Sequence, residues 1–343
     1  MTNKKRPGIR ITQRDIDRFE AMSVLEKDLC SQGYIAIAGV DEAGRGPLAG
    51  PVVAAACILP PGITLYGLND SKKMTEKRRE ALFEDIKEKA LAWSVAMVSN
   101  QEIDRVNILN ATREAMRRAL ADLPHKPDIA LIDAMTLEGF DYPILAEVKG
   151  DARHNVIAAA SVLAKVTRDH MMVNWDKVYP VYGFASHKGY GTTAHIESIK
   201  ESGPCQLHRM SFLSRIAGKA EAAYKTVERG VHVEQMVAQD LIAKGHTILE
   251  HRFAIQGIGE IDFITSHGDR LFVIECKGRS PGNDTYGDVE HALGENQISR
   301  IRKVASAWLQ GQETQSDKII EFVYAPVELD HGGHICSIKY LPF

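Results

Sequence analysis

The stretch YIAIAGVDEAGRGPLAGPVVAAAC (residues 34–57) contains two apolar runs that are separated by two acids and a glycine-rich turn. The first run ends in Asp41 and Glu42, and it predicts a buried strand with negative charge at its end. Such charge is costly unless a cation or a proton compensates it. Gly44, Arg45 and Gly46 follow directly, and glycines allow backbone amides to approach a ligand closely. Together these features indicate a metal-dependent enzyme that acts on phosphate esters.

The composition fits a two-domain protein of the cytoplasm. The chain has 343 residues, of which 44% are hydrophobic and 25% charged, and this length exceeds one ordinary core. No run of eighteen apolar residues occurs, so we expect no membrane segment. The five cysteines lack the spacing of a zinc site or a disulfide framework, which favours a reducing compartment. The net charge is −3, with a slight basic excess before residue 220 that would suit a polyanionic partner.

Alternating strand and helix patterns predict an α/β fold. In the first part we expect strands at 34–40, 52–59, 93–98 and 128–132, and helices at 14–30, 78–90, 107–120 and from 151 onward. In the second part we expect helices at 231–244 and 289–309, and strands at 258–265, 271–276, 319–325 and 335–341. The segment 214–224 is polar and alanine-rich, so we predict domains at 1–215 and 226–343 joined by a linker at 216–225.

Four acids lie at the ends of apolar elements, namely Asp41, Glu42, Asp133 and Asp151. Phosphodiester hydrolysis by two divalent ions needs several converging oxygen ligands, and clustered carboxylates supply them. The alternative is that Asp133 closes a turn and Asp151 caps the following helix. Neighbouring strand residues point to opposite faces, so Asp41 and Glu42 can share an ion only if the strand ends or bulges between them. Otherwise Glu42 contributes from the strand edge.

Residues 34–215 resemble ribonuclease HII in several long motifs that occur in one order. They are GVDEAGRGPLAGPVVAAAC, NDSKKMTEKRRE, NILNATREAM, KGDARHNVIAAASVLAKVTRDHMM, YPVYGFASHKGYGTTAH and SGPCQLHRMSF. The resemblance implies a ribonuclease H-like mixed sheet with flanking helices. It also implies hydrolysis of the RNA strand of RNA–DNA hybrids and nicking 5′ of ribonucleotides in DNA, which leaves 3′-hydroxyl and 5′-phosphate ends. Mn²⁺ or Mg²⁺ would be held by the four acids.

The same resemblance implies where the substrate is contacted. The backbone of Gly44, Arg45 and Gly46, together with Tyr190, would read the ribose 2′-hydroxyl, the group that distinguishes RNA from DNA. Side chains in the family motifs are expected to contact phosphates, and the alternative is that they form a solvated basic face. These side chains are Lys72, Lys165, His187 and Lys188. One departure occurs in LIDAMTLEGF, since many relatives carry a glycine–asparagine pair after the third acid. This departure concerns substrate positioning beside Asp133 rather than metal binding.

A second set of acids lies in the C-terminal part. On a strand through LFVIECKGR, Glu275 and Lys277 point to one face, and Asp262 precedes them in IGEIDFI. Glu234 lies on the apolar stripe of a predicted helix, where it needs a partner. An aspartate followed by Glu-x-Lys is found in many DNA nucleases, and a cross-strand ion pair is the alternative.

Residues 228–309 resemble the YraN-type family through VERGVHVEQMVAQDLIAKGHTIL, GEIDFI and FVIECKGR. The resemblance implies a smaller α/β domain like that of restriction endonucleases. This domain would be a nuclease, a module that holds DNA, or an inert relic. For the chain as a whole, the rivals to a ribonuclease are a DNA-directed nuclease on the same fold and a nucleic-acid binding module with an inactive metal site. The presence of all four acids favours the ribonuclease.

Overall fold

The computed structural model describes residues 10–213, 229–279, 293–312, 315, 318–329 and 335–343. The chain divides into two compact units, Met1–Met172 with His187–Gly218 and Val173–Ser186 with Lys219–Phe343. The second unit takes in Val173–Ser186, which the sequence placed in the first domain. The predicted linker at 216–225 lies outside the described residues, so the limits of the two domains stay a prediction.

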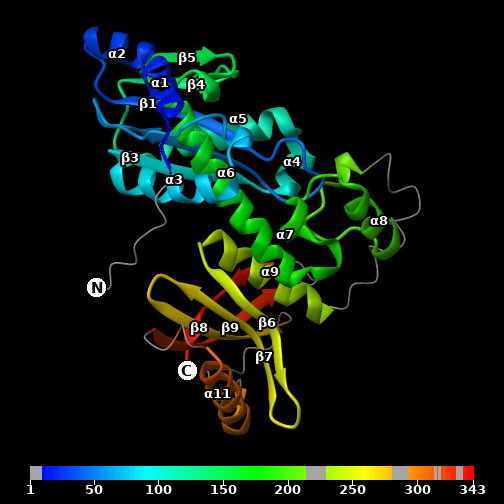
Figure 1. The fold of residues 1–343 in the computed structure, drawn as a ribbon. Coiled ribbons are helices and arrows are strands. Elements are labelled where there is room, and N and C mark those ends of the chain that lie inside the picture. Colours follow the sequence, from blue (N-terminus) through cyan, green and yellow to red (C-terminus); the bar gives the residue numbers. More distant parts are fainter. Residues whose placement is uncertain (1–9, 214–228, 280–292, 313–314, 316–317, 330–334) are drawn as a thin grey trace. The chain divides into compact units, whose positions relative to one another are not determined.

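The first unit is built on a mixed sheet with the strand order β3-β2-β1-β4-β5 (Figure 1). The central strand β1 (Ile37–Ala43) pairs antiparallel with β2 (Val52–Ile58), and β2 pairs antiparallel with β3 (Ala92–Val98). On its other side β1 pairs parallel with β4 (Ile129–Asp133), which pairs parallel with β5 (Ile144–Glu147). The sequence did not predict β5, whose residues are half-buried or exposed and lack a continuous apolar run. The predicted mixed α/β sheet is confirmed.

Helices cover both faces of this sheet. Side chains of α3 (Glu76–Lys89) and α6 (Asn155–Val178) form one buried cluster with alternate residues of β1 and β4, such as Ile37 and Leu131. The intervening residues, such as Val40, join a second cluster with α5 (Ile108–Ala121) and with Ile103 of α4 (Asn100–Val106). The two-residue period of the strands therefore sorts their side chains between two helical layers.

Two helices at the N-terminal end hold the start of α6. The sequence predicted one helix at 14–30, but α1 (Gln13–Met22) ends at Met22, and α2 (Val24–Ser31) begins after Ser23. Asn155 donates to the carbonyl of Phe19 and to the Ser23 hydroxyl, at 3.0 and 2.9 Å. The Glu26 carboxylate accepts the Val156 amide at 2.9 Å. These bonds satisfy polar groups at the N-terminus of α6, which have no partner within the helix.

Short elements complete the described part of the first unit. They are the 3₁₀ turns η1 (Ser71–Lys73), η2 (Gly150–Ala152) and η4 (Met210–Phe212), together with α8 (Thr193–Ser202). The turn η3 (Pro180–Tyr182) belongs to the second unit, and α7 (Phe184–His187) lies at the limit of that segment. None of these elements was predicted, because each is too short to show a hydrophobic period.

The second unit contains a six-stranded sheet in its described residues, with the order β10-β9-β8-β7-β6 and with β11 paired to β9. The strands are β6 (Thr247–Ile255), β7 (Gly259–His267), β8 (Arg270–Arg279), β9 (Ile319–Leu329), β10 (Ile335–Ile338) and β11 (Leu341–Pro342). Helices α9 (Arg229–Ala243) and α11 (Glu295–Gln310) pack on it. The sequence missed β6, and residues 289–292 of the predicted last helix lie outside the described part.

The helices that the structure describes include none with the length and apolar character needed to cross a bilayer. All five cysteines carry free thiols.

Candidate active site

Two of the predicted acids lie at the carboxyl ends of neighbouring parallel strands. The register pairs Val40 of β1 with Ile132 of β4, and Asp41 and Asp133 are the next residues of the two strands. Because side chains alternate, both acids point to the face that α6 covers. A Cβ placed on Gly39, two residues before Asp41, would lie 2.1 Å from the carbonyl carbon of Val156 in α6, which agrees with this placement. Ligands commonly bind at such strand ends in α/β sheets.

Glu42 points away from Asp41. The expected break in the strand between them is absent, since the pairing continues from Asp41 with Ala55 to Ala43 with Val53 without a shift. The side chains of Asp41 and Glu42 therefore lie on opposite faces. A guanidinium nitrogen of Arg45 lies 3.5 Å from the Glu42 carboxylate. This geometry leaves the alternative that Glu42 contributes to the metal site from the strand edge, which stays a prediction.

Asp151 is brought next to Asp133 by a backbone contact. Asp151 lies in η2, and the Gly150 amide donates to Oδ1 of Asp133 at 2.7 Å. The alternative that Asp151 caps the following helix does not fit, because α6 begins only at Asn155. The Asp151 side chain is buried nonetheless. A buried acid that caps no helix is costly and calls for another compensating charge.

The charges of these acids act on one another. Burial and the charge of Glu42 raise the pKa of Asp41 well above its ordinary value. Burial also raises the pKa of Glu42, although Arg45 acts against this, and burial together with nearby acids raises the pKa of Asp151. Partial burial alone would lower the pKa of Lys72, but the charges of Asp41 and Asp151 raise it. Lys72 is thus the predicted phosphate ligand whose charge acts most directly on the acids.

The donor set fits a hard divalent cation. Asp41, Glu42, Asp133 and Asp151 offer only oxygen donors, which Mg²⁺ and Mn²⁺ prefer. Burial is the largest cause of the raised pKa values of three of them, and neighbouring acids add to it, so a bound cation would stabilise their charged forms. Among the described residues, no three His, Cys, Asp or Glu side chains are close enough to hold an ion together. The four metal ligands therefore stay a prediction that depends on the chemistry of the donors.

The sequence analysis missed two buried arginines that hold the turn after β1. Arg168 of α6 and Arg209 are the largest fully buried side chains among the described residues, with exposures of 1% and 0%. Arg168 donates to the carbonyls of Ala49, Pro51 and Lys188, each at 3.0 Å. Arg209 donates to the carbonyls of Gly44, Arg45 and Gly50 at 2.6, 3.0 and 2.9 Å. Five of these six carbonyls belong to the turn between Gly44 and Pro51.

One signal of a buried arginine was present in the sequence. Arg168 follows Ser161 by seven residues and Ala164 by four, a spacing that places all three on one face of a helix. Ser161 and Ala164 are both buried. For Arg209, in the irregular segment before η4, the sequence shows no comparable period.

Gly44 and Gly46 of the turn have different roles. Gly44 has a φ of +96°, and a Cβ placed on it would lie 2.1 Å from Nε of Arg168. Gly46 is exposed, and a Cβ placed on it would have its nearest contact at 3.8 Å, with Cε1 of Tyr190. Gly44 therefore makes room for Arg168, while Gly46 lies beside Tyr190. The structure thus brings together the exposed part of the turn and the tyrosine predicted to read the ribose.

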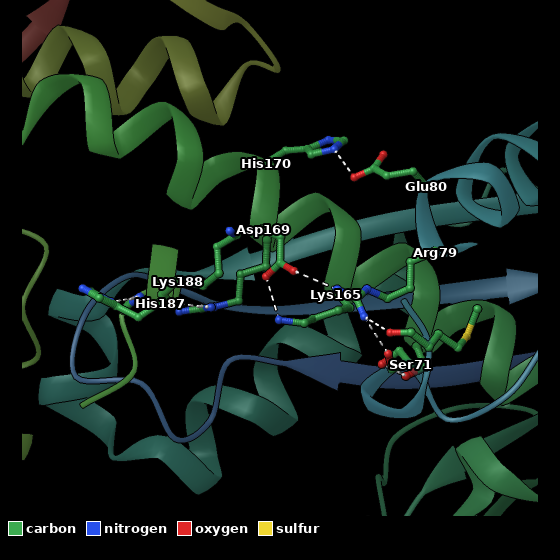
Figure 2. A network of polar contacts seen from close by, with 12 residues as sticks. Ser71, Arg79, Glu80, Lys165, Asp169, His170, His187 and Lys188 are labelled. Carbon is green, nitrogen blue, oxygen red and sulfur yellow. Dashed lines mark hydrogen bonds and ion pairs between the residues drawn. The ribbon is translucent and has the colours of Figure 1, made fainter. Parts of the chain in front are cut away.

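The other predicted phosphate ligands take part in a network that Figure 2 shows. Nζ of Lys165 lies 2.7 Å from the Asp169 carboxylate and 5.9 Å from the centre of the Tyr190 ring. His187 stacks on His195 with ring centres 4.4 Å apart. Lys188 has a φ of +52°, and its carbonyl accepts from Arg168. In the same view Arg79 donates to the Ser71 carbonyl at 3.0 Å, which links α3 to η1.

A pair of buried histidines supports the Tyr190 backbone, and the sequence analysis missed it. The Cys205 amide donates to Nδ1 of His208 at 2.9 Å, so the proton of neutral His208 lies on Nε2. That nitrogen is 3.1 Å from Nε2 of His195, and Nδ1 of His195 is 2.9 Å from the Tyr190 carbonyl. Burial lowers the pKa of His195 to about 4 and that of His208 to about 3. Both rings are therefore neutral at pH 7, and His195 donates to Tyr190.

In the second unit, the Glu234 carboxylate forms ion pairs with two basic side chains. Its carboxylate lies 3.0 Å from Nε2 of His251 and 2.7 and 2.8 Å from two guanidinium nitrogens of Arg252, both on β6. Burial acts to raise the pKa of Glu234, but the hydrogen bonds from His251 and Arg252 lower it to about 2. The prediction that Glu234 needs a partner is confirmed. Its place among metal ligands stays a prediction.

Asp262 and Glu275 lie on the adjacent strands β7 and β8. Oδ2 of Asp262 accepts the Cys276 amide at 2.7 Å, and Oε1 of Glu275 accepts from Gln297 of α11 at 2.8 Å. Oε2 of Glu275 is buried and has no partner among the described residues. Burial raises the pKa of Asp262 to about 6 and that of Glu275 to about 8. Lys277 is exposed, and both its place in a metal site and the alternative of a cross-strand ion pair stay predictions.

Comparisons with known proteins match the two parts of the chain separately. Residues 38–215 match the family described as Ribonuclease HII, and residues 233–324 match Uncharacterised protein family UPF0102. A ribonuclease HII of Ruminiclostridium cellulolyticum is 52% identical over 200 residues, which cover 58% of this chain and 78% of that protein. A ribonuclease HII of Moorella thermoacetica is 53% identical over 204 residues, or 60% of this chain and 99% of that protein. The crystal structure of ribonuclease H2 from Pyrococcus horikoshii matches 56% of this chain and 99% of its own, with 28% identity and a TM-score of 0.45.

Proposed function

Because the chain belongs to the ribonuclease HII family through residues 38–215, we propose that it hydrolyses the RNA strand of RNA–DNA hybrids. It also nicks DNA on the 5′ side of embedded ribonucleotides and leaves 3′-hydroxyl and 5′-phosphate ends. The enzyme depends on a metal, as its family does, and we propose Mn²⁺ or Mg²⁺. Its partners are nucleic acids, and we propose a cytoplasmic location, which the five free thiols support.

The observation that supports this proposal is that two acids lie near the ends of neighbouring strands and that the turn after one of these strands lies beside Tyr190. Asp41 and Asp133 follow paired residues of two parallel strands and point to one face. The turn that begins directly after β1 presents Gly46 next to Tyr190. The proposed metal ligand Asp41 and the proposed ribose contact Gly46 are therefore separated by only four residues of chain.

The residues of the site divide the work. Asp41, Asp133 and Asp151 would hold the metal ions, with Glu42 at the strand edge. When bound, the ions supply an activated water and stabilise the 3′-oxygen that leaves. The Gly150 amide fixes the orientation of the Asp133 carboxylate. Lys72, which acts on the same acids, provides a positive charge for a neighbouring phosphate.

A duplex that contains one ribonucleotide tests this proposal. Wild-type protein with Mn²⁺ is expected to cut it once, and Asp133→Asn is expected to reduce kcat at least 100-fold. The matched control is Asp141→Asn, because Asp141 is exposed and paired with Lys126 on the surface. Equal cleavage by wild type and Asp133→Asn would refute the assignment of the site.

The same assay separates the rival functions. If all-DNA duplex is cut as fast as the hybrid, the protein is a DNA-directed nuclease on this fold. If the hybrid is bound without turnover in any divalent metal, the protein is a binding module.

A second candidate function concerns the second unit. Oε2 of Glu275 has no partner among the described residues, and burial, to which neighbouring acids add, raises the pKa values of Asp262 and Glu275, so a bound cation would stabilise both carboxylates. We propose weak metal-dependent cleavage of DNA that needs both acids and Lys277. The full chain carrying Asp133→Asn, which silences the first site, should nick plasmid DNA slowly with Mn²⁺. Adding Glu275→Gln should abolish the nicking, and unchanged nicking after this addition would leave the second unit without a catalytic role.

A further inference from the structure

Two buried arginines that form no ion pair with the described residues hold the turn between β1 and β2. Arg168 and Arg209 are buried, and among the described residues neither lies within ion-pair distance of a carboxylate. Their pKa values are lowered by burial, to about 10 and about 9 respectively, so both guanidinium groups remain charged at pH 7. A buried charge without a counter-ion is costly unless hydrogen bonds satisfy it. Six carbonyl oxygens do so here.

The carbonyls that Arg209 binds determine where two amides point. The peptide bonds of the described chain are trans, so in each peptide plane the N–H points opposite to the C=O. The Gly44 carbonyl shares its plane with the Arg45 amide, and the Arg45 carbonyl shares its plane with the Gly46 amide. Since both carbonyls point inward at Arg209, both amides point away from it.

These two amides are free to bind a ligand. Arg45 and Gly46 are exposed, and within the described residues neither amide donates to a protein acceptor. By contrast, the next amides of the turn are engaged: Leu48 donates to the Gly189 carbonyl and Gly50 to the Leu207 carbonyl, both at 2.8 Å. An unpaired pair of consecutive amides forms an anion- or hydroxyl-binding concavity.

We propose that Arg209, supported by Arg168, is a positioning residue for ribose recognition, because it holds the Gly44 and Arg45 carbonyls inward and thereby aims the Arg45 and Gly46 amides at the bound strand. The inference rests on the proposed function of the site. Arg168 contributes by fixing the other end of the turn through Ala49 and Pro51. Neither arginine touches the substrate.

A lysine cannot reproduce this arrangement. It keeps the positive charge but offers a single nitrogen in place of the planar fork that reaches three carbonyls at once. Arg209→Lys should therefore release at least one of the carbonyls of Gly44 and Arg45 while preserving the charge beneath the turn. The effect on recognition then reports the geometry of the turn rather than its electrostatics.

The test compares affinity for two duplexes of one sequence, one with a single ribonucleotide and one all-DNA. Full-length protein carrying Asp133→Asn is titrated with each duplex in Mn²⁺ by fluorescence anisotropy. The parent should bind the ribonucleotide duplex at least tenfold more tightly. Arg209→Lys should reduce this preference at least fivefold, while affinity for the all-DNA duplex changes less than twofold. Arg118→Lys is the matched control, because Arg118 pairs with Glu102 and Glu114 on the surface.

The outcomes distinguish the reading of the ribose by this site from the role of Arg209 in it. If the parent shows no preference, the proposed reading of the ribose by this site fails. If the parent discriminates and Arg209→Lys discriminates equally while its melting temperature falls, Arg209 is structural only and the inference is overturned.

Should Arg209→Lys fail to fold, amide NMR resonances of the parent decide instead. Those of Arg45 and Gly46 should shift differently with the two duplexes, and identical shifts would overturn the inference.

Discussion

Replacing the two glycines of the turn one at a time separates a structural requirement from a functional one. In Gly44→Ala, the new Cβ would lie 2.1 Å from Nε and 2.5 Å from Cδ of Arg168, and 2.9 Å from the Pro51 carbonyl oxygen. The backbone there has a φ of +96°, which costs an alanine about 1–2 kcal/mol. Arg168 must also move, and each of its buried hydrogen bonds that is lost costs about 1–3 kcal/mol. We therefore expect Gly44→Ala to destabilise the first unit by about 2–5 kcal/mol.

Gly46→Ala is the matched comparison. A Cβ at Gly46 would meet its nearest atom at 3.8 Å, an ordinary contact with the Tyr190 ring, and its φ is not in the left-handed region. We expect a change in stability below about 0.5 kcal/mol, as for most surface substitutions. We also expect kcat/KM for a single-ribonucleotide duplex to fall at least tenfold, because the methyl group occupies the exposed surface on which the ribose would sit.

Hydrogen exchange measured by mass spectrometry on peptides of β1 and β2 gives the stability of the first unit alone. This matters because a chain of two units does not unfold in a single two-state step. The reasoning would be refuted if Gly44→Ala left the protection of these strands unchanged, or if Gly46→Ala weakened it as much. The first result would mean that Arg168 does not need the space that Gly44 leaves, and the second would mean that Gly46 is also structurally required.

Three further predictions follow from single contacts. Burial lowers the pKa of His195 to about 4 and that of His208 to about 3. Below pH 6.5 the unfolded chain therefore binds more protons than the folded chain, and the free energy of unfolding falls as the pH drops. The slope should approach about 1.4 kcal/mol per pH unit for each ring, and His208→Gln should lower the slope between pH 6.5 and 4.5 in urea titrations. Ala134 has a φ of +50°, so Ala134→Gly should stabilise the first unit by about 0.5–1 kcal/mol, and a loss of stability on thermal unfolding would contradict this. Glu234→Gln should destabilise the second unit by about 2 kcal/mol, because it weakens the ion pair with His251 and Arg252. The loss of stability should be the same with and without Mn²⁺. A loss seen only with Mn²⁺ would instead support a metal-binding role for Glu234.

The apolar runs of the sequence predicted the centre of the first sheet because their side chains are buried on both faces. Residues 52–58 are all buried, which matches the continuous run that predicted β2. The predicted strand at 34–40 was displaced by three residues, since β1 continues through Asp41 and Glu42 to Ala43. Polar side chains interrupt an apolar run without interrupting backbone pairing, so the sequence could not locate the end of this strand.

β6 was missed for a related reason. In TILEHRFAI, Ile248 is the one buried residue and the others are partly buried or exposed, and charged side chains fill several of these positions. Two of these, His251 and Arg252, are the partners of Glu234. The sequence showed that Glu234 needed a partner, but the identity of that partner depends on tertiary contacts across 17 and 18 residues. A hydrophobic pattern carries no information on such pairs.

The arginines under the turn show most clearly what a single sequence leaves out. Buried arginine is rare, and no role was predicted for Arg168 or Arg209 from the sequence. Their burial becomes favourable only when the carbonyls of Gly44, Arg45 and Ala49 converge on them, and this convergence exists only in the folded protein.

The same contacts also change the meaning of the glycine-rich turn. Its glycines predicted close approach of a ligand, yet at Gly44 the group that approaches is Arg168. Only Gly46 remains open to a ligand from outside. The acids and the turn could therefore be predicted from the sequence. The direction in which the turn presents its amides is set by two side chains more than 120 residues away, and Arg209 is 165 residues from Gly44.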